Sequence, residues 1–273
     1  MFQVPRHVLQ ECTEKSPMQC KPCTFPMLDF APTTEDGPFD IVFDTEKFVV
    51  VARPEEFVCV MFYQRAFSNF DGCPVPMKVG DFTIQPPCGE AGFKMACAAT
   101  FGDWEVFKKA LYAETPKACK QTSRAITGFV ATEWDSRAFE AMTHVQRWKV
   151  QNPDMFNFLK TIQDVAETAL VPLEKVCFFE STTNDQIWGT GVDTHPLKDR
   201  ILALPRELGS AKFEFLAETI HPEGKNQLGR ALNVVFREIS PCRTLEDYVA
   251  SLAHAPTLFA VCDAAPAIGR TMS

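Results

Sequence analysis

Residues 184–191 combine side chains that could bind and act on a sugar or a base. Asp185 supplies a carboxylate, Trp188 supplies a flat aromatic face, and a Gly-Thr-Gly turn follows directly. Glycines let backbone N–H groups approach a ligand because no Cβ stands in the way. The alternative is a connecting turn whose tryptophan folds into the core, since a lone Gly-x-Gly is common. Taken alone, the stretch favours the turn, and the other motifs of the chain shift the balance toward a site.

A second candidate lies at the start of a helix near residue 227. Apolar residues recur there at helical spacing: Leu228, Ala231, Leu232, Val235 and Ile239. Gly224-Lys225-Asn226 then stands at the helix N-terminus, where free N–H groups, the positive dipole end and a lysine favour an anion. Gly229 costs about 1 kcal/mol relative to alanine inside a helix, which indicates close packing against it.

A third candidate is Glu90, in a helix that we expect after Pro86 and Pro87. Glu90, Phe93, Lys94 and Cys97 fall on one helical face. Phe93 and Cys97 favour burial of that face, which would bring Glu90 to a partly buried position. The alternative is an exposed Glu–Lys pair, worth only ~0.2–0.5 kcal/mol. The apolar neighbours favour a Glu90 that lines a site.

Two further candidates are weaker. A strand is expected over residues 57–63, and the segment Arg65-Ala66-Phe67-Ser68-Asn69-Phe70 follows it. This segment places polar side chains between aromatic ones and could line a site. The alternative is an ordinary cap at the end of the strand. Thr132 and Asp135 match a capping box for a helix that runs to about Val150. Trp134 lies in its first turn, where it could border a pocket, although core burial is usual.

The rest of the chain supplies the elements that must position these residues. Further strands are expected near residues 39–43, 47–52, 77–84 and 176–179, and further helices over residues 154–170 and after Thr244. Residues 1–38 contain many prolines and read as an irregular N-terminal segment. Residues 192–223 show no clear period and read as an insertion or lid. The domain prediction is an irregular segment (1–38), a catalytic domain (39–256) and a C-terminal tail that frays (257–273).

Composition narrows the class of protein. The 273 residues include 27 basic and 35 acidic ones, a net charge of −8, which disfavours general nucleic-acid binding. One basic run could grip nucleic acid locally or be a solvated helical face: Lys108, Lys109, Lys117, Lys120 and Arg124. Eleven irregularly spaced cysteines, no signal peptide and no membrane-spanning run indicate a cytoplasmic or nuclear protein. Cys20 and Cys23 lack a second ligand pair, so we expect no metal site.

Four motifs stand in one order: Phe67-Ser-Asn-Phe, Glu90 at a helix start, Asn184-Asp-x-x-Trp-Gly-Thr-Gly and Gly224-Lys-Asn-Gln-Leu-Gly-Arg. Together they resemble the NADAR superfamily over roughly residues 62–238, and the last two motifs are the specific ones. The resemblance implies a helix-rich α+β fold, YbiA-like, with a small β-sheet. It also implies an N-glycosidase without a cofactor.

By this resemblance, Glu90 matches the catalytic glutamate, Asp185 the second acid, and Trp134 and Trp188 the aromatic walls. Asn69, Gly189, Lys225 and Asn226 would line the ribose-phosphate pocket, and the same motifs extend the binding surface to Arg65, Phe67, Ser68, Thr190, Gly191 and Gly229. The family commonly carries a lysine where this chain has Cys97, and Lys94 is the nearest lysine. Either the second acid, Asp185, or a lysine, for which Lys94 is the candidate, could assist the departing base.

Three functions follow from the resemblance. The first is hydrolysis of the N-glycosidic bond between ADP-ribose and guanine, in nucleic acid or a nucleotide. The second is cleavage of riboflavin-biosynthesis intermediates, and the third is a non-catalytic ADP-ribose-binding module. The long segment 192–223 and the basic run favour the first, because both could hold a substrate larger than one nucleotide. The sequence leaves the oligomeric state open.

Overall fold

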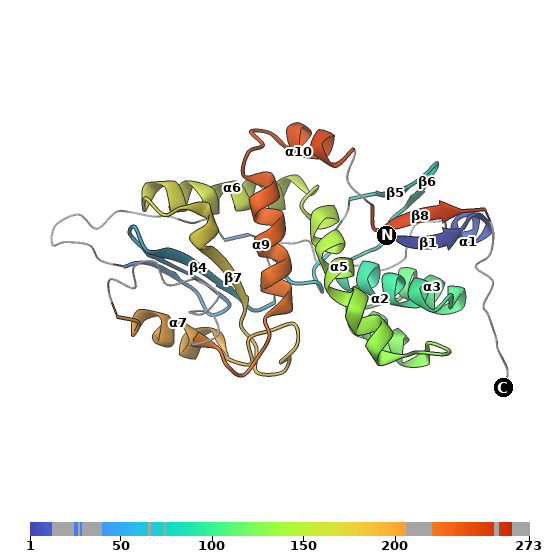
Figure 1. Ribbon diagram of the computed structural model, residues 1–273, viewed down its shortest axis with the longest axis horizontal. Coiled ribbons are helices and arrows are strands. Elements are labelled where there is room, and N and C mark those ends of the chain that lie inside the picture. Colours follow the sequence, from blue (N-terminus) through green and yellow to red (C-terminus); the bar gives the residue numbers. More distant parts are fainter. Residues whose placement is uncertain are drawn as a thin grey trace. The chain divides into compact units, whose positions relative to one another are not determined.

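The computed structural model describes residues 1–12, 25–26, 28, 40–64, 67–73, 75–205, 220–253 and 257–263, except for the side chain of Ile41. The chain divides into two compact units. The first contains Met1–Cys23, Asn69–Asn152 and Val249–Ser273, and the second contains Thr24–Ser68 and Pro153–Tyr248. Helices dominate both units and the sheets are small, so the fold is α+β, as the sequence predicts (Figure 1).

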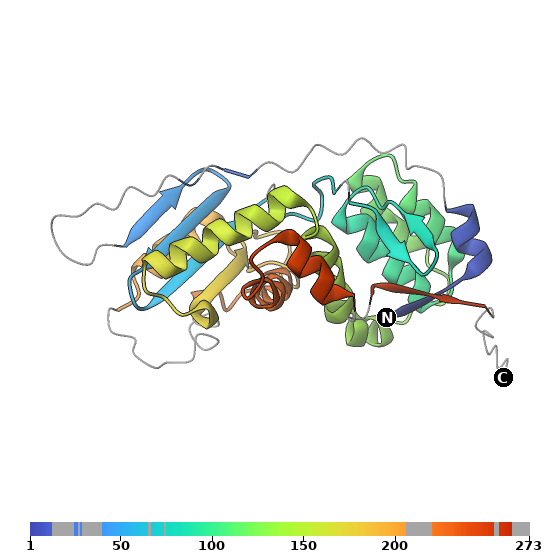
Figure 2. The same ribbon diagram turned by 90° about the horizontal axis from the view of Figure 1, so that it is seen from above.

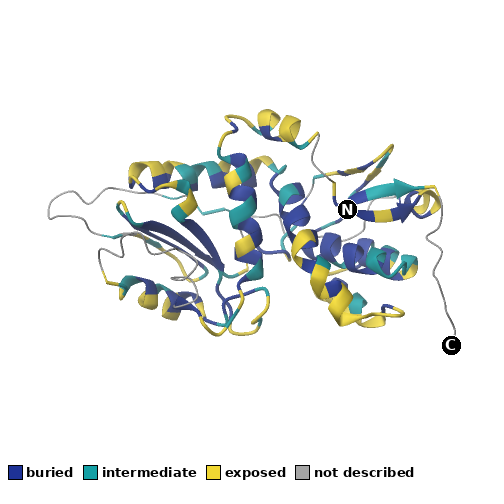
Figure 3. Cartoon of the chain, in the orientation of Figure 1, coloured by how far each residue is buried: buried dark blue, intermediate teal, exposed yellow. Residues whose placement is uncertain are grey.

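The second unit is built on a four-stranded sheet in the order β2-β3-β4-β7. Its strands are β2 (Ile41–Asp44), β3 (Phe48–Arg53), β4 (Phe57–Phe62) and β7 (Val176–Glu180). The first three form an antiparallel meander, whereas β4 and β7 are parallel. Every residue of β3 and β4 is buried, which explains why both strands read as continuous apolar runs (Figure 3).

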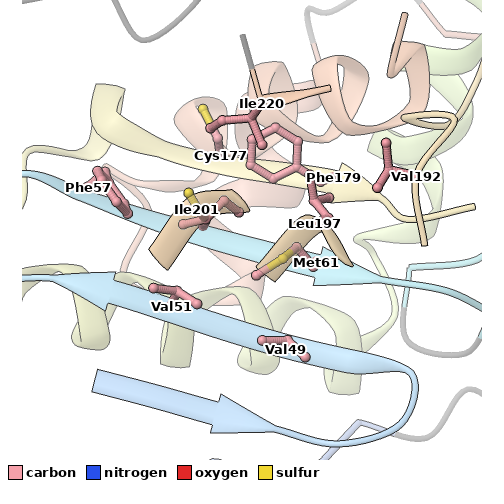
Figure 4. Close-up of a cluster of buried hydrophobic side chains, with 11 residues drawn as sticks. Val49, Val51, Phe57, Met61, Cys177, Phe179, Val192, Leu197, Ile201 and Ile220 are labelled. Carbon is pink, nitrogen blue, oxygen red and sulfur yellow. The ribbon is translucent and has the colours of Figure 1, made fainter. Parts of the chain in front are cut away.

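Helices cover both faces of this sheet. In Figure 1, α6 (Pro153–Thr168) lies above the sheet and α7 (Thr194–Leu202) below it, and Figure 2 shows α6 running over the strands. On the α7 side, Leu197 and Ile201 pack into a cluster of buried apolar side chains from β3, β4 and β7 (Figure 4). On the α6 side, Phe158 stacks against Phe48 and Phe67. A short 3-10 turn, Leu173–Lys175, leads into β7. Helix α9 (Gln227–Ile239) packs along β7.

The first unit is mainly helical. Its helices are α1 (Arg6–Glu11), α2 (Gly89–Thr100), α3 (Trp104–Leu111), α4 (Pro116–Thr122) and α5 (Ala131–Lys149), with a 3-10 turn at Ser123–Ala125. A hairpin of β5 (Met77–Val79) and β6 (Phe82–Ile84) precedes α2, and β1 (Phe2–Pro5) pairs in parallel with β8 (Phe259–Cys262). Helix α10 (Leu245–Leu252) begins in the second unit and ends in the first.

The two chain ends differ from the expectation of irregular segments. Strand β1 and helix α1 occupy residues 2–11, and β8 lies where a fraying tail was expected. Phe2 and Val4 are buried, and the Phe2 and Phe259 rings meet edge to face. The pairing joins residues more than 250 positions apart in the sequence. Local composition does not reveal such a partner, so the short strands read as loop.

Two other local predictions were wrong. Helix α5 begins at Ala131 with Val130 as its N-cap and no side-chain cap, so Thr132 and Asp135 form no capping box. Residues 194–202 are not part of an irregular insertion, because they form α7 and contribute to the core. The remainder of that segment, residues 206–219, lies outside the described residues.

A buried arginine fixes the end of α7. Arg53 on β3 is 2% exposed and forms a two-pronged ion pair with Asp40, at 3.0 and 3.1 Å. The same guanidinium donates to the carbonyl oxygens of Ile201, Leu202, Leu204 and Pro205. Carbonyl groups at the end of a helix have no N–H partners within the helix, and the guanidinium of Arg53 provides the hydrogen-bond donors that they lack.

No helix within the described part of the chain is both long and apolar enough to cross a membrane.

Candidate active site

The predicted site residues fall into two groups, one in each unit. The first unit holds Asn69, Glu90, Lys94 and Trp134, and the second holds Phe67, Ser68, Asp185, Trp188, Gly189, Thr190, Gly191, Lys225, Asn226 and Gly229. Arg65 lies outside the described residues. Each group is described on its own.

In the first unit, Glu90 and Lys94 form a largely buried charged pair. Glu90 lies in the first turn of α2, and its Oε1 is 3.5 Å from Nζ of Lys94. The two side chains are 9% and 15% exposed, so the alternative of a solvated surface pair is wrong. Burial of both charges strengthens their interaction relative to water and favours keeping them together. The pair can hold a carboxylate and a proton donor side by side.

Aromatic rings lie next to this pair. The Phe93 ring centroid lies 5.2 Å from the Lys94 ammonium and 5.0 Å from the Trp134 ring centroid. Trp134 is buried and also stacks near Phe2, so it does not lie half exposed at a pocket mouth. Cys97, one turn beyond Lys94, is buried, and burial raises the pKa of its thiol to about 12. Its sulfur is therefore a protonated, poorly nucleophilic group at neutral pH.

Sequence reasoning missed two buried polar residues that support Asn69 and the start of α2. The Gln146 amide on α5 donates to Oδ1 of Asn69 at 2.9 Å, and the Asn69 carbonyl accepts the Glu90 N–H at 2.8 Å. Asn69 Nδ2 donates to the Met142 sulfur. A Cβ on Gly89 would lie 2.6 Å from Asn69 Oδ1 and 3.0 Å from Cδ of Lys149, so only glycine fits there.

The sequence pattern does not single out these residues. Gln146 and Lys149 are 0% and 3% exposed although they are polar, and each directly follows a residue of the apolar stripe of α5, Val145 and Trp148. Buried polar side chains require partners, which Gln146 finds in Asn69. The helical period marks the apolar stripe but not the neighbouring side of the helix that is also buried, so it did not reveal this contact.

In the second unit, Asp185 stabilises its own turn. Its Oδ1 accepts the N–H groups of Ile187 at 3.1 Å and Trp188 at 2.9 Å. Its main-chain carbonyl accepts the Gly189 N–H. The arrangement is an Asx-type turn, in which the carboxylate substitutes for main-chain partners. Trp188 is partly buried, whereas Phe67 is fully buried among the rings of Phe62 and Phe178 and belongs to the core.

The N-terminus of α9 is occupied by protein, which corrects the expectation of free N–H groups. The N–H groups of residues 225–228 donate to the main-chain carbonyls of residues 186–189: Lys225 to Gln186, Asn226 to Gly189, Gln227 to Ile187 and Leu228 to Trp188. The helix dipole still points at this turn, but these donors are already used. Lys225 keeps an exposed side chain and is the cation that this motif offers to an anion.

Asn226 and Gly229 join α9 to strand β7. Asn226 adopts a left-handed conformation with φ 48°, and its amide accepts the Glu180 N–H and donates to the Phe178 carbonyl. A Cβ on Gly229 would overlap that same carbonyl oxygen and the Asn226 side chain. The expectation of close packing at Gly229 is confirmed, and the packing partner is the backbone of β7. Both residues serve the fold.

The remaining glycines of the two motifs interlock. A Cβ on Gly224 would collide with the Gly189 and Thr190 backbones, and one on Gly191 (φ 73°) would lie 2.8 Å from Cβ of Glu223. Glu223 is in turn held by Arg200 through two hydrogen bonds of 2.8 and 2.9 Å. The two sequence motifs of the second unit therefore form one structural element, which we call the paired loop (residues 181–191 and 220–228).

The family model of the NADAR domain matches residues 59–240 of the chain. The chain belongs to the NADAR family. The matched region contains all the predicted site residues, from Arg65 to Gly229, and includes the paired loop, α2 and α5. NADAR domains are of the N-glycosidase type, a class of hydrolase. No match was found among curated proteins.

Within this NADAR domain, no group of three or more His, Cys, Asp or Glu side chains that could hold a metal ion occurs among the described residues. Cys20 and Cys23 lie outside those residues.

Proposed function

We propose that this NADAR protein is an N-glycosidase that hydrolyses the bond between ADP-ribose and a guanine base. The observation that carries the proposal is the buried Glu90–Lys94 pair in a NADAR domain. A carboxylate with an ammonium partner provides the two functions that the reaction needs, a negative charge for the sugar and a proton for the base.

Hydrolysis of an N-glycosidic bond separates the base from the anomeric carbon and adds water to that carbon. The C–N bonding electrons leave with the base, which takes up a proton, and positive charge develops on the sugar. Glu90 stabilises this charge and accepts the proton of the attacking water. Lys94, whose Nζ is 3.5 Å from the Glu90 carboxylate, donates the proton that the departing base takes up.

Residues of the second unit enter the proposal through the family resemblance. Asp185 is proposed as the second acid and Trp188 as a stacking surface for the base, a contact worth about 1–3 kcal/mol in nucleic-acid binders. Lys225, exposed in the paired loop, is proposed to attract a phosphate group. Asn226 and Gly229 are left out, because their contacts with β7 account for them.

Two features of the sequence favour guanine-linked ADP-ribose over a riboflavin intermediate: the basic run and the segment 192–223. Lys108, part of the basic run, is held by Glu11 at 2.9 Å and Glu105 at 2.7 Å, so its charge is compensated locally. This observation favours the smaller, riboflavin-type substrate as the second candidate. The other feature is the segment 192–223, which contains α7, and its residues 206–219 lie outside the described part of the chain.

The deciding experiment compares initial rates on two substrates. One is a guanine oligonucleotide that carries ADP-ribose, and the other is a ribosylaminouracil phosphate. Release of ADP-ribose at the higher rate supports the proposal, and faster cleavage of the metabolite replaces it with the second candidate. Binding of ADP-ribose without turnover of either substrate would indicate a reader module.

A further inference from the structure

The first unit contains a cavity that the proposed reaction does not use. It has a volume of about 310 Å³ and is lined by twelve residues from β5, the last turns of α5, the end of α10 and the stretch before β8. Two of the lining residues, Trp148 and Leu258, lie beside Gly92 of α2. Neither Glu90 nor Lys94 is in the lining.

The walls of the cavity are mainly apolar. Met77 contributes from β5, Trp148 from α5, Leu252 from α10, and Leu258 from the stretch before β8. The Trp148 indole N–H donates to the Val75 carbonyl at 3.0 Å, which fixes the ring in place. A preformed apolar cavity of this size with a few polar groups is typical of small-molecule sites.

The charged side chains in the lining of the cavity are both positive, and the other polar side chains there, His144, Gln151 and Thr257, are neutral. Arg147 and Lys78 are in the lining, and none of the twelve described lining residues is Asp or Glu. One N–H group of Arg147 faces Nδ1 of His144 at 3.4 Å. Burial, followed by the Arg147 charge, lowers the pKa of His144, so the imidazole is neutral at pH 7. Glu140 approaches Nε2 of His144 at 3.6 Å but does not line the cavity. In a protein of net charge −8, this cluster is a local exception.

We infer that this cavity is a second ligand site, which binds a small organic anion with an apolar body. The apolar part would occupy the space between Trp148, Leu252 and Leu258, and the anionic group would bind Arg147, with Lys78 at the rim. A guanidinium is suited to this role because it offers parallel N–H donors to a carboxylate. The apolar body could be an alkyl chain or an aromatic ring system, and the anionic group is common to both.

The test compares acids with a matched alcohol on the intact protein. Decanoate and decanol share a chain and differ in charge, and 1-naphthoate supplies an aromatic body of the same charge. Affinity is measured by isothermal titration calorimetry and by the rise in melting temperature. We expect at least one acid to bind about tenfold more tightly than decanol, the equivalent of one hydrogen bond to a charged group. The tighter acid identifies the apolar body.

Variants then locate the binding. Arg147→Gln should remove the preference for the acid, and Arg147→Lys should retain most of it. Leu252→Trp should block binding by filling the cavity. Arg243→Gln, which removes an exposed arginine elsewhere, is the matched control and should bind like the wild type. Equal affinity for acid and alcohol, no binding of either acid, or unchanged binding in Arg147→Gln would each overturn the inference. None of these readouts depends on glycosidase activity.

Discussion

The first turn of α2 and the paired loop both carry motif residues of the NADAR family, but they use them differently. At the start of α2, the motif supplies a charged side chain, Glu90, which is buried and paired with Lys94 one turn further along the helix. In the paired loop, it supplies glycines, an Asn and an Asp whose main-chain and side-chain groups bond to neighbouring backbone. A family motif can thus identify chemistry in one place and architecture in another. The contacts of each residue distinguish the two.

The largest expected effect is on catalysis at α2. Glu90→Gln keeps the shape of the side chain and removes its charge, so we expect kcat to fall by about 10²- to 10⁴-fold, the usual contribution of a general acid or base. The measurement is the initial rate of base release. Circular dichroism should show a folded protein.

Glu133→Gln is the matched control, because Glu133 is an exposed carboxylate in the first turn of α5. It should retain the wild-type rate. A Glu90→Gln variant with the wild-type rate would remove Glu90 from the mechanism and with it the catalytic half of the comparison.

The next effect is on folding at the paired loop. Gly229→Ala places a methyl group against the Phe178 carbonyl and the Asn226 side chain, so we expect the free energy of unfolding to fall by about 1–3 kcal/mol. Urea denaturation measures it. Gly92→Ala in α2 is the matched control, because its Cβ would find its nearest atom at 3.5 Å. That variant should be neutral or gain up to about 1 kcal/mol. Equal stability of the two variants would contradict the architectural role of Gly229.

A smaller effect concerns acid stability in the same loop. His221 is buried against Phe179, and burial lowers its pKa below the ordinary value of about 6.5. The unfolded chain therefore binds more protons than the folded one below that pH, and stability falls as the pH falls through about 6.5. Each unit by which the pKa is lowered corresponds to about 1.4 kcal/mol.

The check is urea denaturation of wild type and His221→Gln between pH 8 and pH 5. The variant should lose less stability than the wild type across the acid part of that range, whatever its stability at pH 8. His144 in the first unit has a lowered pKa of the same cause and should leave some acid sensitivity in the variant. Identical pH profiles would show that His221 does not titrate in this way.

The smallest effect is on ligand affinity at Lys225. Its side chain is exposed, so Lys225→Ala should weaken binding of ADP-ribose by only about two- to fivefold at low salt, in line with exposed ion pairs. The difference should shrink as salt rises, because exposed charges are screened. Lys225→Arg should bind like the wild type, and stability should be unchanged in both. Equal ADP-ribose affinity in Lys225→Ala and wild type at low salt would leave the paired loop with an architectural role alone.

Much of the fold could be predicted from the sequence, because its signals are local. The strands at residues 48–53, 57–62 and 176–180 and the helices α2, α5, α6 and α9 follow from apolar runs and helical periodicity. Long-range partners could not be predicted. The β1–β8 pairing and the four hydrogen bonds from residues 225–228 to residues 186–189 join segments that carry no sign of each other.

In the candidate site, too, the local features could be predicted and the long-range partners could not. The periodicity placed Glu90 and Lys94 on one buried face, and the structure agrees. It also made the N-terminus of α9 look vacant, since a helix start always has unpaired N–H groups until a partner is known. Asn226 looked like a ligand contact for the same reason, although its amide is used by Phe178 and Glu180.

Two arginines determine how the second unit could be re-engineered. Arg53 binds the carbonyls of Leu204 and Pro205, and Arg200 binds the carbonyl of Ile220. The residues that flank positions 206–219 on both sides are therefore held by side chains of β3 and α7. A graft of different length or sequence between these two anchor points leaves β3, α7 and the paired loop with their own contacts. Exchange of residues 206–219 between NADAR proteins is accordingly a way to test whether that segment affects substrate preference without rebuilding the scaffold.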